Sequence, residues 1–250
     1  MAQRHIVLKE TLGDAAMWRK KRVIFAAITA LAVLSVVFPY YNQTMLFLAF
    51  APHHNQNTLV LDAGHGGIDG GAVAEDGTAE QDINLAIVQK CQALAEFFGI
   101  RTVLTRTDRN SLQYDPNQTV RHNKIQDIHA RETRTNQTQN PIFISVHLNK
   151  FSDSRYTGAQ TFWSKNNPEG QLLAQSIQEQ LTNGLHPEKQ RTAKQAPDSV
   201  YLMKHLTCPA MIVECGFLSN REETERLKQD GYQKKLSVCV INGYLNYLEG

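Results

Sequence analysis

The chain has 250 residues, of which 42% are hydrophobic and 20% are charged, which is sufficient for one globular domain with a full core. Its 15 glycines and 8 prolines are close to average usage, which excludes a collagen-like or wholly disordered protein. The net charge of +2 is uneven, because residues 1–22 carry an excess of four positive charges and residues 52–250 are slightly acidic. A slightly acidic body lacks the clustered positive charge that nucleic-acid binding requires, so no nucleic-acid partner is expected.

The first predicted element is an apolar segment near the N-terminus. Residues 23–41 are uncharged and are together long enough for the ~30 Å hydrocarbon core of a bilayer. Four consecutive basic residues precede them, and the positive-inside rule then leaves residues 1–22 in the cytoplasm as a basic leader. The pattern predicts a transmembrane signal anchor at the cell membrane over residues 23–41, a linker over 42–57 and a folded domain over 58–250 outside the cytoplasm. A cleavable signal peptide and a buried core helix are the alternatives.

Residues 58–250 alternate between short apolar strands and amphipathic helices. The predicted strands are 58–63, 101–106, 142–147, 160–164 and 211–215. The predicted helices, with apolar residues at steps of three and four, are 82–98, 168–184 and 233–248. Residues 107–126 form the least regular stretch, which is polar and long for a passive connection. This alternation predicts an α/β fold whose sheet is covered by helices on both faces.

The chain contains four cysteines. Cys91 falls on the apolar stripe of the predicted helix 82–98, and Cys215 lies inside an apolar strand. Buried free thiols are therefore favoured, although disulfides stay open for an exported domain. Because no Cys-x-x-Cys pair is present, the sequence does not support a cysteine zinc site.

Three predicted strands carry side chains suited to metal binding or acid–base chemistry near their carboxyl ends. His65 follows the first strand, His147 ends the third, and Glu214 lies in the last. In open α/β sheets ligands bind outside the carboxyl ends of the strands, so we expect these residues to share a site. Two histidines and one carboxylate with an open fourth position form a catalytic zinc arrangement.

Such a site needs one carboxylate to bind the metal and a second one to transfer protons. The carboxylate that completes the metal site could be Glu75, Asp76 or Glu80, which all follow His65. Glu80 is best placed because a helix N-terminus favours a negative group, although an ordinary first-turn acid would occupy the same position. Glu214 is flanked by apolar residues, where a carboxylate is costly without a function or a partner. Held beside a metal site, it can act as general base and then as general acid.

Five motifs stand out between residues 58 and 250, namely LDAGHGG (61–67), Glu80 followed by DINL (82–85), Thr105-Arg106, ISVHLN (144–149) and VECGFLSN (213–220). In this order and spacing they resemble the zinc-dependent N-acetylmuramoyl-L-alanine amidases of bacterial cell walls. The resemblance implies a mixed, mostly parallel sheet and hydrolysis of the amide between N-acetylmuramic acid and L-alanine in peptidoglycan. It also implies Zn²⁺ bound by His65, Glu80 and His147, with Glu214 as the catalytic carboxylate. Asn149 and Arg131 are expected to contact the substrate.

Within that family, the chain is most similar to the sporulation amidases that help to make muramic-δ-lactam in spore cortex. The similarity lies in GAQTFW (158–163), DSVYL (198–202) and the basic stretch 121–131. It implies a role in cortex maturation and a polysaccharide deacetylase as a candidate partner in the same pathway. Another zinc peptidase acting on wall stem peptides and a non-catalytic, membrane-tethered wall-binding protein are the alternatives.

Overall fold

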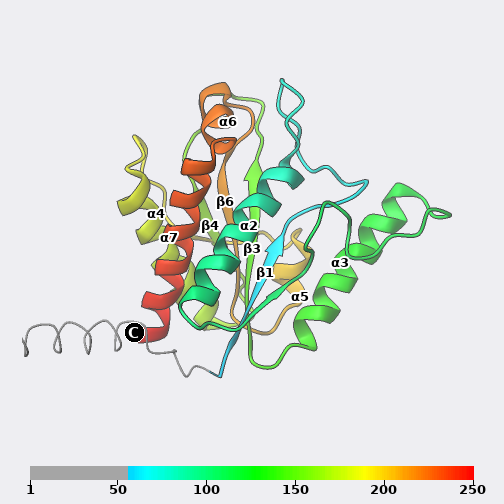
Figure 1. The fold of residues 1–250 in the computed structure, drawn as a ribbon, viewed down its shortest axis with the longest axis horizontal. Coiled ribbons are helices and arrows are strands. Elements are labelled where there is room, and N and C mark those ends of the chain that lie inside the picture. Colours follow the sequence, from blue (N-terminus) through cyan, green and yellow to red (C-terminus); the bar gives the residue numbers. More distant parts are fainter. Residues whose placement is uncertain (1–55) are drawn as a thin grey trace, which may run out of the picture. The chain divides into compact units, whose positions relative to one another are not determined.

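The computed structural model describes residues 56–250. The predicted leader, the signal anchor and most of the linker therefore lie outside the described residues. Among residues 56–250, no helix is long and apolar enough to cross a membrane. This range forms a six-stranded sheet with helices on both faces, as the sequence predicts (Figure 1).

The sheet has the strand order β2-β1-β3-β6-β4-β5. Its strands are β1 (Thr58–Ala63), β2 (Thr102–Leu104), β3 (Pro141–Asn149), β4 (Gln160–Trp163), β5 (Lys194–Gln195) and β6 (Ala210–Phe217). The first four in spatial order are parallel to one another, whereas β4 pairs antiparallel with β6 and β5 pairs parallel with β4. The expectation of a mixed, mostly parallel sheet is confirmed, and the carboxyl ends of β1, β3 and β6 meet at one edge.

One face of the sheet is covered by three long helices, α2 (Glu80–Phe97), α4 (Pro168–Leu185) and α7 (Asp230–Glu249) (Figure 1). The strands contribute fully buried aliphatic side chains to this larger core, including Leu61, Ile144 and Val213. Helix α4 begins where the Asn167 side chain accepts a hydrogen bond from the Glu169 N–H, with proline in its first turn. All three helices agree with the predicted ones, with shifts at their ends.

The larger core also contains three of the four cysteines. Cys91 on α2, Cys215 on β6 and Cys239 on α7 are buried, and Cys208 is half-buried. All four are free thiols, as predicted. Burial raises the pKa of the Cys91 thiol to about 12, so it stays protonated and unreactive.

The opposite face is covered by α3 (Val120–Asn136) and the short α5 (Tyr201–His205). The expectation of an irregular stretch over 107–126 is wrong from Val120 onward, because α3 begins there. Its buried residues are polar, so no apolar period reveals the helix; they are Asn123, Asp127, Arg131 and Thr135. The short helix α6 (Arg221–Leu227), which follows β6, was also not predicted. It buries Glu223 and Thr224 besides Leu227.

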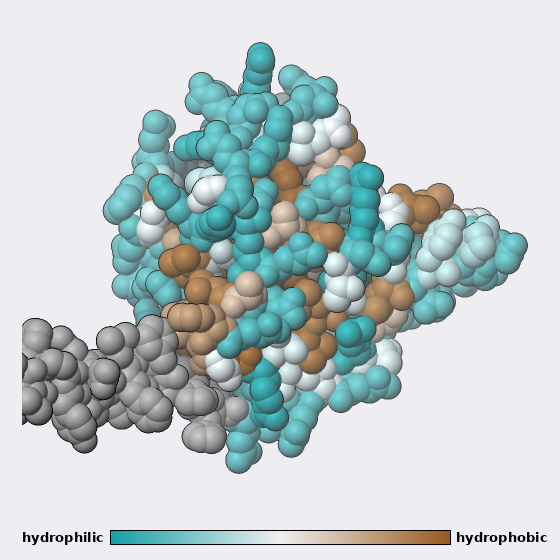
Figure 2. Space-filling view, viewed as in Figure 1, coloured by the Kyte–Doolittle hydropathy of each residue, from teal (hydrophilic) through white to brown (hydrophobic). Residues whose placement is uncertain are grey.

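The view of Figure 2 shows a mainly hydrophilic surface with separate hydrophobic patches. Among the large hydrophobic side chains that are exposed in residues 56–250, Phe151 and Tyr156 both lie on the loop between β3 and β4. This loop leaves the edge of the sheet at which β1, β3 and β6 end.

Candidate metal centre

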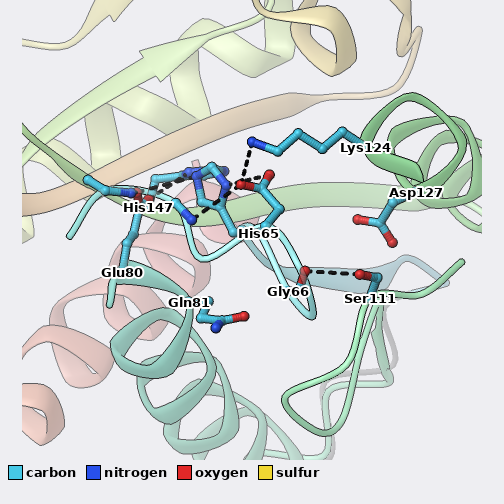
Figure 3. A network of polar contacts seen from close by, with 12 residues as sticks. His65, Gly66, Glu80, Gln81, Ser111, Lys124, Asp127 and His147 are labelled. Atoms are coloured by element: carbon cyan, nitrogen blue, oxygen red, sulfur yellow. Dashed lines mark hydrogen bonds and ion pairs between the residues drawn. The ribbon is translucent and has the colours of Figure 1, made fainter. Parts of the chain in front are cut away.

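Three potential metal ligands meet at the carboxyl edge of the sheet. His65 follows β1, His147 belongs to β3, and Glu80 is the first residue of α2. Their ligand atoms all lie within 4.8 Å of one another, and Figure 3 shows the three side chains converging from these elements. Glu80 Oε1 is 3.0 Å from His147 Nδ1, and Glu80 Oε2 is 3.3 Å from His65 Nε2. The structure thus brings together the three residues that the sequence singles out.

The other two candidate acids lie away from this cluster. Asp76 forms an ion pair of 2.8 Å with Lys228 on the surface, and Glu75 is exposed. Glu80, by contrast, is 3% exposed and accepts hydrogen bonds from the backbone N–H groups of Ala72 and Leu148, both at 2.9 Å. Of the three candidate acids, Glu80 alone joins the cluster.

Two glycines allow the cluster to pack this closely. A Cβ atom on Gly64 would lie 2.3 Å from Cε1 of His147, and one on Gly71 would lie 2.6 Å from Oε2 of Glu80. Gly71 also has a φ of +70°, and His65 itself has a φ of 63°, in the left-handed region that non-glycine residues seldom adopt. Strained backbone of this kind persists where the surrounding structure fixes it, often at functional sites.

Further side chains orient the candidate ligands. Asp69 Oδ2 lies 2.9 Å from His65 Nδ1, which leaves the other ring nitrogen of His65 directed at the cluster. Lys124, which extends from α3 toward the cluster in Figure 3, holds the second oxygen of Asp69 at 2.7 Å. Asn84 donates hydrogen bonds of 3.2 Å to Glu80 Oε1 and to the Gly64 carbonyl. A carboxylate behind a histidine is the usual outer contact of a metal ligand, because it fixes the tautomer.

The electrostatics of the cluster favour a positive charge at its centre. Burial would lower the pKa of His65, but hydrogen bonds and charge from Asp69 and Glu80 outweigh it and raise the pKa to about 9. Burial would raise the pKa of Glu80, yet His147 and His65 hold it well below its usual value. A buried, ionised carboxylate between two imidazoles is a donor set that could hold a metal ion.

Glu214 lies beside this cluster on β6, paired in register with His147. Its Oε2 atom is buried and has no hydrogen-bond partner within residues 56–250. Burial raises the pKa of Glu214 to about 7, with Glu80 adding to the rise and His147 opposing it. A carboxyl group with a pKa near neutrality can both accept and donate a proton at physiological pH.

A cavity of about 140 Å³ adjoins the cluster between α3, α5 and the sheet. Its wall includes both candidate histidine ligands and an apolar side formed by Ile128, Val200, Leu202, Met203 and Ile212. Asp62 and Arg131 form part of the polar side. The cavity gives room beside the cluster for part of a ligand.

The structure places Arg131 behind the backbone that carries His65, in contact with Asp62 and Asp127. Its side chain is 3% exposed, and its guanidinium binds Asp62 at 2.6 Å and Asp127 at 2.8 Å. It also donates hydrogen bonds to the carbonyls of Ala63 at 2.8 Å and His65 at 2.6 Å. These contacts fix the backbone that carries His65. Arg131 also lines the cavity beside the cluster, and its contact with the substrate stays a prediction.

Asn149, the other expected substrate contact, is half-buried at the end of β3. Its side-chain oxygen accepts a hydrogen bond of 3.0 Å from the N–H of Lys150. A contact with the substrate stays a prediction for this residue.

Three polar residues near the site were not assigned a role from the sequence. Arg106 donates hydrogen bonds to the carbonyls of Ala63, Gly64 and Gln81 and so ties the end of β1 to the start of α2. Asp69 and Asn84 each lie four positions after a candidate ligand, His65 and Glu80 respectively. For Asn84 that spacing places both side chains on one face of a helix and could have revealed the contact.

An α/β fold that brings two histidines and a buried glutamate together beside a second glutamate is typical of a hydrolase with a metal-type site. The family described as N-acetylmuramoyl-L-alanine amidase matches residues 59–246, and the chain belongs to this family. The germination-specific N-acetylmuramoyl-L-alanine amidase of Bacillus subtilis (strain 168) is 31% identical over 189 residues, which cover 76% of this chain and 78% of that protein. The amidase AmiA of Salmonella typhimurium is 24% identical over 237 residues, covering 77% and 76%.

The chain is also similar to solved structures of amidases. The CwlD amidase from Clostridioides difficile, solved in complex with the GerS lipoprotein, is 40% identical and superposes with a TM-score of 0.74 over 78% of this chain and 99% of that one. The catalytic domain of CwlV from Bacillus (Paenibacillus) polymyxa, 24% identical, shares the fold with a TM-score of 0.66 over 77% and 98%. The protein is an enzyme, an amidase that acts on peptidoglycan, and the family resemblance read from its motifs is confirmed.

Proposed function

We propose that this amidase cleaves the bond between the lactyl group of N-acetylmuramic acid and L-alanine with one Zn²⁺ ion held by His65, Glu80 and His147. The observation that carries the proposal is this cluster of two imidazoles and one buried carboxylate within 4.8 Å. Three such ligands with a position left for water or substrate are typical of catalytic zinc. Zinc in this position would polarise the amide carbonyl and make a water molecule more acidic.

Glu214 moves the proton in this proposal. Its buried Oε2, which has no hydrogen-bond partner among residues 56–250, accepts a proton from the attacking water and then delivers that proton to the nitrogen of L-alanine. Without protonation the amine is a poor leaving group. The raised pKa of Glu214, about 7, suits a group that must pass through both states in each turnover.

The remaining polar residues position these groups. Asp69 and Asn84 hold His65 and Glu80 in their orientations, and Arg131 holds the backbone between β1 and His65. Asn149 is proposed to contact the substrate because it ends β3 two positions after His147.

The reaction is tested by mass spectrometry of purified sacculi after digestion by the protein. The proposal predicts intact stem peptides with a new amino group on L-alanine, and loss of this product when a chelator is added and its recovery when zinc is returned. Cleavage between two amino acids of the stem peptide would identify a peptidase instead. Unchanged digestion in the chelator, after the protein is shown to be metal-free, would contradict the metal-dependent mechanism.

We further propose a role in maturation of the spore cortex, supported by the germination-specific relative from Bacillus subtilis. Removal of the stem peptide frees the lactyl carboxyl group, which can close onto the amine of the same sugar once its N-acetyl group is removed. Muramic-δ-lactam formation therefore needs a polysaccharide deacetylase in the same pathway. A lipoprotein partner is proposed by analogy with the complex of the Clostridioides difficile amidase. Spores lacking this protein should contain no muramic-δ-lactam; a normal lactam content would contradict the role.

We also propose that residues 23–41 anchor the protein in the cell membrane with its catalytic domain outside the cytoplasm. The support is the uncharged, apolar segment and the basic residues before it. Full-length protein should remain in the membrane fraction after a salt wash, whereas a chain starting at His53 should be soluble and active on isolated walls. Release of the full-length protein by salt would contradict the anchor.

A further inference from the structure

Three aromatic rings form a cluster at the same edge of the sheet as Glu214. The ring centroids of Phe151 and Tyr156 are 5.1 Å apart, and they lie 5.2 Å and 5.9 Å from that of Phe217. Phe217 is 1% exposed, whereas Phe151 is 46% and Tyr156 is 39% exposed. The cluster therefore has a buried base and an exposed aromatic surface, and the hydrolytic site described above uses none of its members.

Arg191 packs against this cluster. Its guanidinium carbon lies 4.8 Å from the ring centroid of Phe217 and 5.9 Å from that of Tyr156, within the range of cation–π contacts. Its Nε donates a hydrogen bond of 2.8 Å to the carbonyl of Thr157, and its Nη1 donates one of 3.3 Å to Oε1 of Gln160. Its Nη2 is buried with no hydrogen-bond partner in residues 56–250. The arginine thus links the aromatic rings to β4.

Gln160, which bonds Arg191, lies next to Glu214 in the sheet. Gln160 on β4 is the antiparallel register partner of Glu214 on β6, so the two side chains stand next to each other on one face of the sheet. Gln160 accepts the hydrogen bond from Arg191, so the neighbour of Glu214 on β4 belongs to the same set of contacts as the aromatic rings. Phe217 pairs with Asn149 as Glu214 pairs with His147, so the aromatic cluster lies at the same strand ends as the hydrolytic site.

Hydrogen bonds hold the loop that carries Phe151 and Tyr156. The buried carboxylate of Glu223 accepts one from the N–H of Gly158 and one from the N–H of Phe217, both of 2.8 Å. Asn220 donates one of 2.8 Å to the carbonyl of Ser154, in the middle of the loop. Because the loop is anchored on both sides of Tyr156, the exposed rings are fixed before a ligand arrives, which reduces the entropy lost on binding.

The chemistry of the substrate indicates what such a surface would bind. In N-acetylmuramic acid the lactyl group that carries the scissile amide is an ether on the pyranose ring, so a productive complex must place that ring close to Glu214. One face of a pyranose presents C–H groups, which suit the electron-rich face of an aromatic ring. The stem peptide next to the amide presents mainly amide and carboxyl groups and lacks a comparable flat C–H face.

We propose that Phe151 and Tyr156, supported by Phe217 and Arg191, form a subsite on which a sugar ring of the glycan strand stacks. The inference rests on the amidase function proposed above. It specifies in addition that the glycan strand lies on the side of the site where Phe151 and Tyr156 are exposed. The subsite orients the strand so that the lactyl amide of a neighbouring muramic acid reaches Glu214.

The test compares two soluble substrates, a tetrasaccharide glycan fragment carrying stem peptides and a single muramoyl residue carrying the same peptide. We expect Phe151→Ala and Tyr156→Ala each to lower the ratio of kcat/KM for the tetrasaccharide to kcat/KM for the monosaccharide by about tenfold. Tyr156→Phe, which keeps the ring, should retain the wild-type ratio. The matched control is Leu172→Ala, which truncates a 53% exposed side chain on α4 and should change neither rate.

A second measurement uses binding alone, with a peptide-free tetrasaccharide as the probe and Glu214→Gln as the background protein. The alanine variants should weaken binding by the same factor as they lower the kinetic ratio. An unchanged ratio, or equal losses on both substrates, would overturn the subsite and would point to the stem peptide, another partner or a structural role. If the wild-type protein cleaves neither substrate, the proposed function fails, and the binding measurement then decides the subsite independently.

Discussion

The two faces of the sheet differ in the side chains that the same strands direct toward them. On the face covered by α2, α4 and α7, buried apolar residues continue to the carboxyl ends of the strands, namely Ala63, Val146, Leu148, Val213 and Cys215. On the face covered by α3 and α5, the strands begin with apolar residues and end with polar ones, namely Asp62, Ser145, His147 and Glu214. The face covered by α2, α4 and α7 stabilises the fold through apolar packing. On the face covered by α3 and α5, a polar network takes the place of this packing at the strand ends that form the site.

Asp62 is the centre of that network. It is 1% exposed and accepts hydrogen bonds from Arg131, Thr105 and Ser145. Buried charges cost several kcal/mol each unless their partners are well placed, so this region depends on a few specific contacts. The apolar face, by contrast, spreads its stability over many side chains. The predictions below test the polar site and the apolar packing separately.

The largest effect is expected at a metal ligand. His147→Ala should remove the metal and lower activity at least ~10³-fold, because two protein ligands do not hold a catalytic zinc and the metal contributes several kcal/mol to catalysis. Metal content and peptidoglycan cleavage are measured on the same sample. The control is His122→Ala, an exposed histidine on α3, which should keep both. A His147→Ala protein with full metal content would remove His147 from the ligand set.

The next effect concerns proton transfer alone. Glu214→Gln should keep the metal and the melting temperature while losing at least ~10² in kcat, since an amide cannot cycle a proton. Glu179→Gln, an exposed glutamate on α4, serves as the matched control and should be fully active. Near wild-type turnover of Glu214→Gln would contradict its role as general base and acid.

The polar network should respond to acid. Burial would raise the pKa of Asp62, but the charge of Arg131 and the hydroxyls of Ser145 and Thr105 hold it below its usual value. Folded Asp62 therefore binds its proton less tightly than unfolded Asp62. Its contribution to stability is fully present above the unfolded pKa of about 4 and is lost as pH falls through the lower folded value.

Asp62→Asn should accordingly cost about 3–5 kcal/mol of unfolding free energy at pH 7, because it leaves Arg131 buried with half of its charge partners. The loss should shrink as the pH is lowered toward 3 in denaturant unfolding experiments. A penalty that stays constant between pH 7 and pH 3 would show that the carboxylate charge is not what stabilises this region.

The smallest effect is a change in folding stability, expected when two glycines of α7 on the apolar face are replaced by alanine. A Cβ atom on Gly243 would lie 2.5 Å from Cα of Ile177 on α4, whereas one on Gly231 would meet nothing within 4 Å. Gly243→Ala should destabilise the fold by about 1–3 kcal/mol because the two helices must move apart. Gly231→Ala should stabilise it by about 0.5–1 kcal/mol through helix propensity. Equal effects of the two substitutions in thermal unfolding would contradict close packing of α4 on α7.

The difference between the faces also explains how much of the fold could be predicted from the sequence. Helices α2, α4 and α7 bury aliphatic stripes and leave a clear period, so all three were predicted. Helix α3 contributes mainly polar side chains to the interior and shows no such period. Only the tertiary structure shows that Arg131 and Asp127, four positions apart on that helix, face Asp62 and the end of β1.

The candidate site was predictable where its residues lie at strand ends. His65, His147 and Glu214 follow from the strand pattern, and Glu80 from its motif and its place at a helix start. The supporting contacts were not predictable, because they join segments distant in sequence; examples are Lys124 with Asp69 and Gln160 with Arg191. The supporting contacts of Arg131 were not predictable for the same reason, and its contact with the substrate stays a prediction. Its burial is visible only in the fold.

The central claim is that the cluster of His65, Glu80 and His147 holds one zinc ion on which hydrolysis depends. The most direct test is titration of chelator-stripped protein with Zn²⁺ while the release of stem peptides from sacculi is followed. The account predicts no release without metal and a linear rise in activity that ends at one equivalent of zinc per chain. Full activity of the metal-free protein, or an end point at a different stoichiometry, would contradict it.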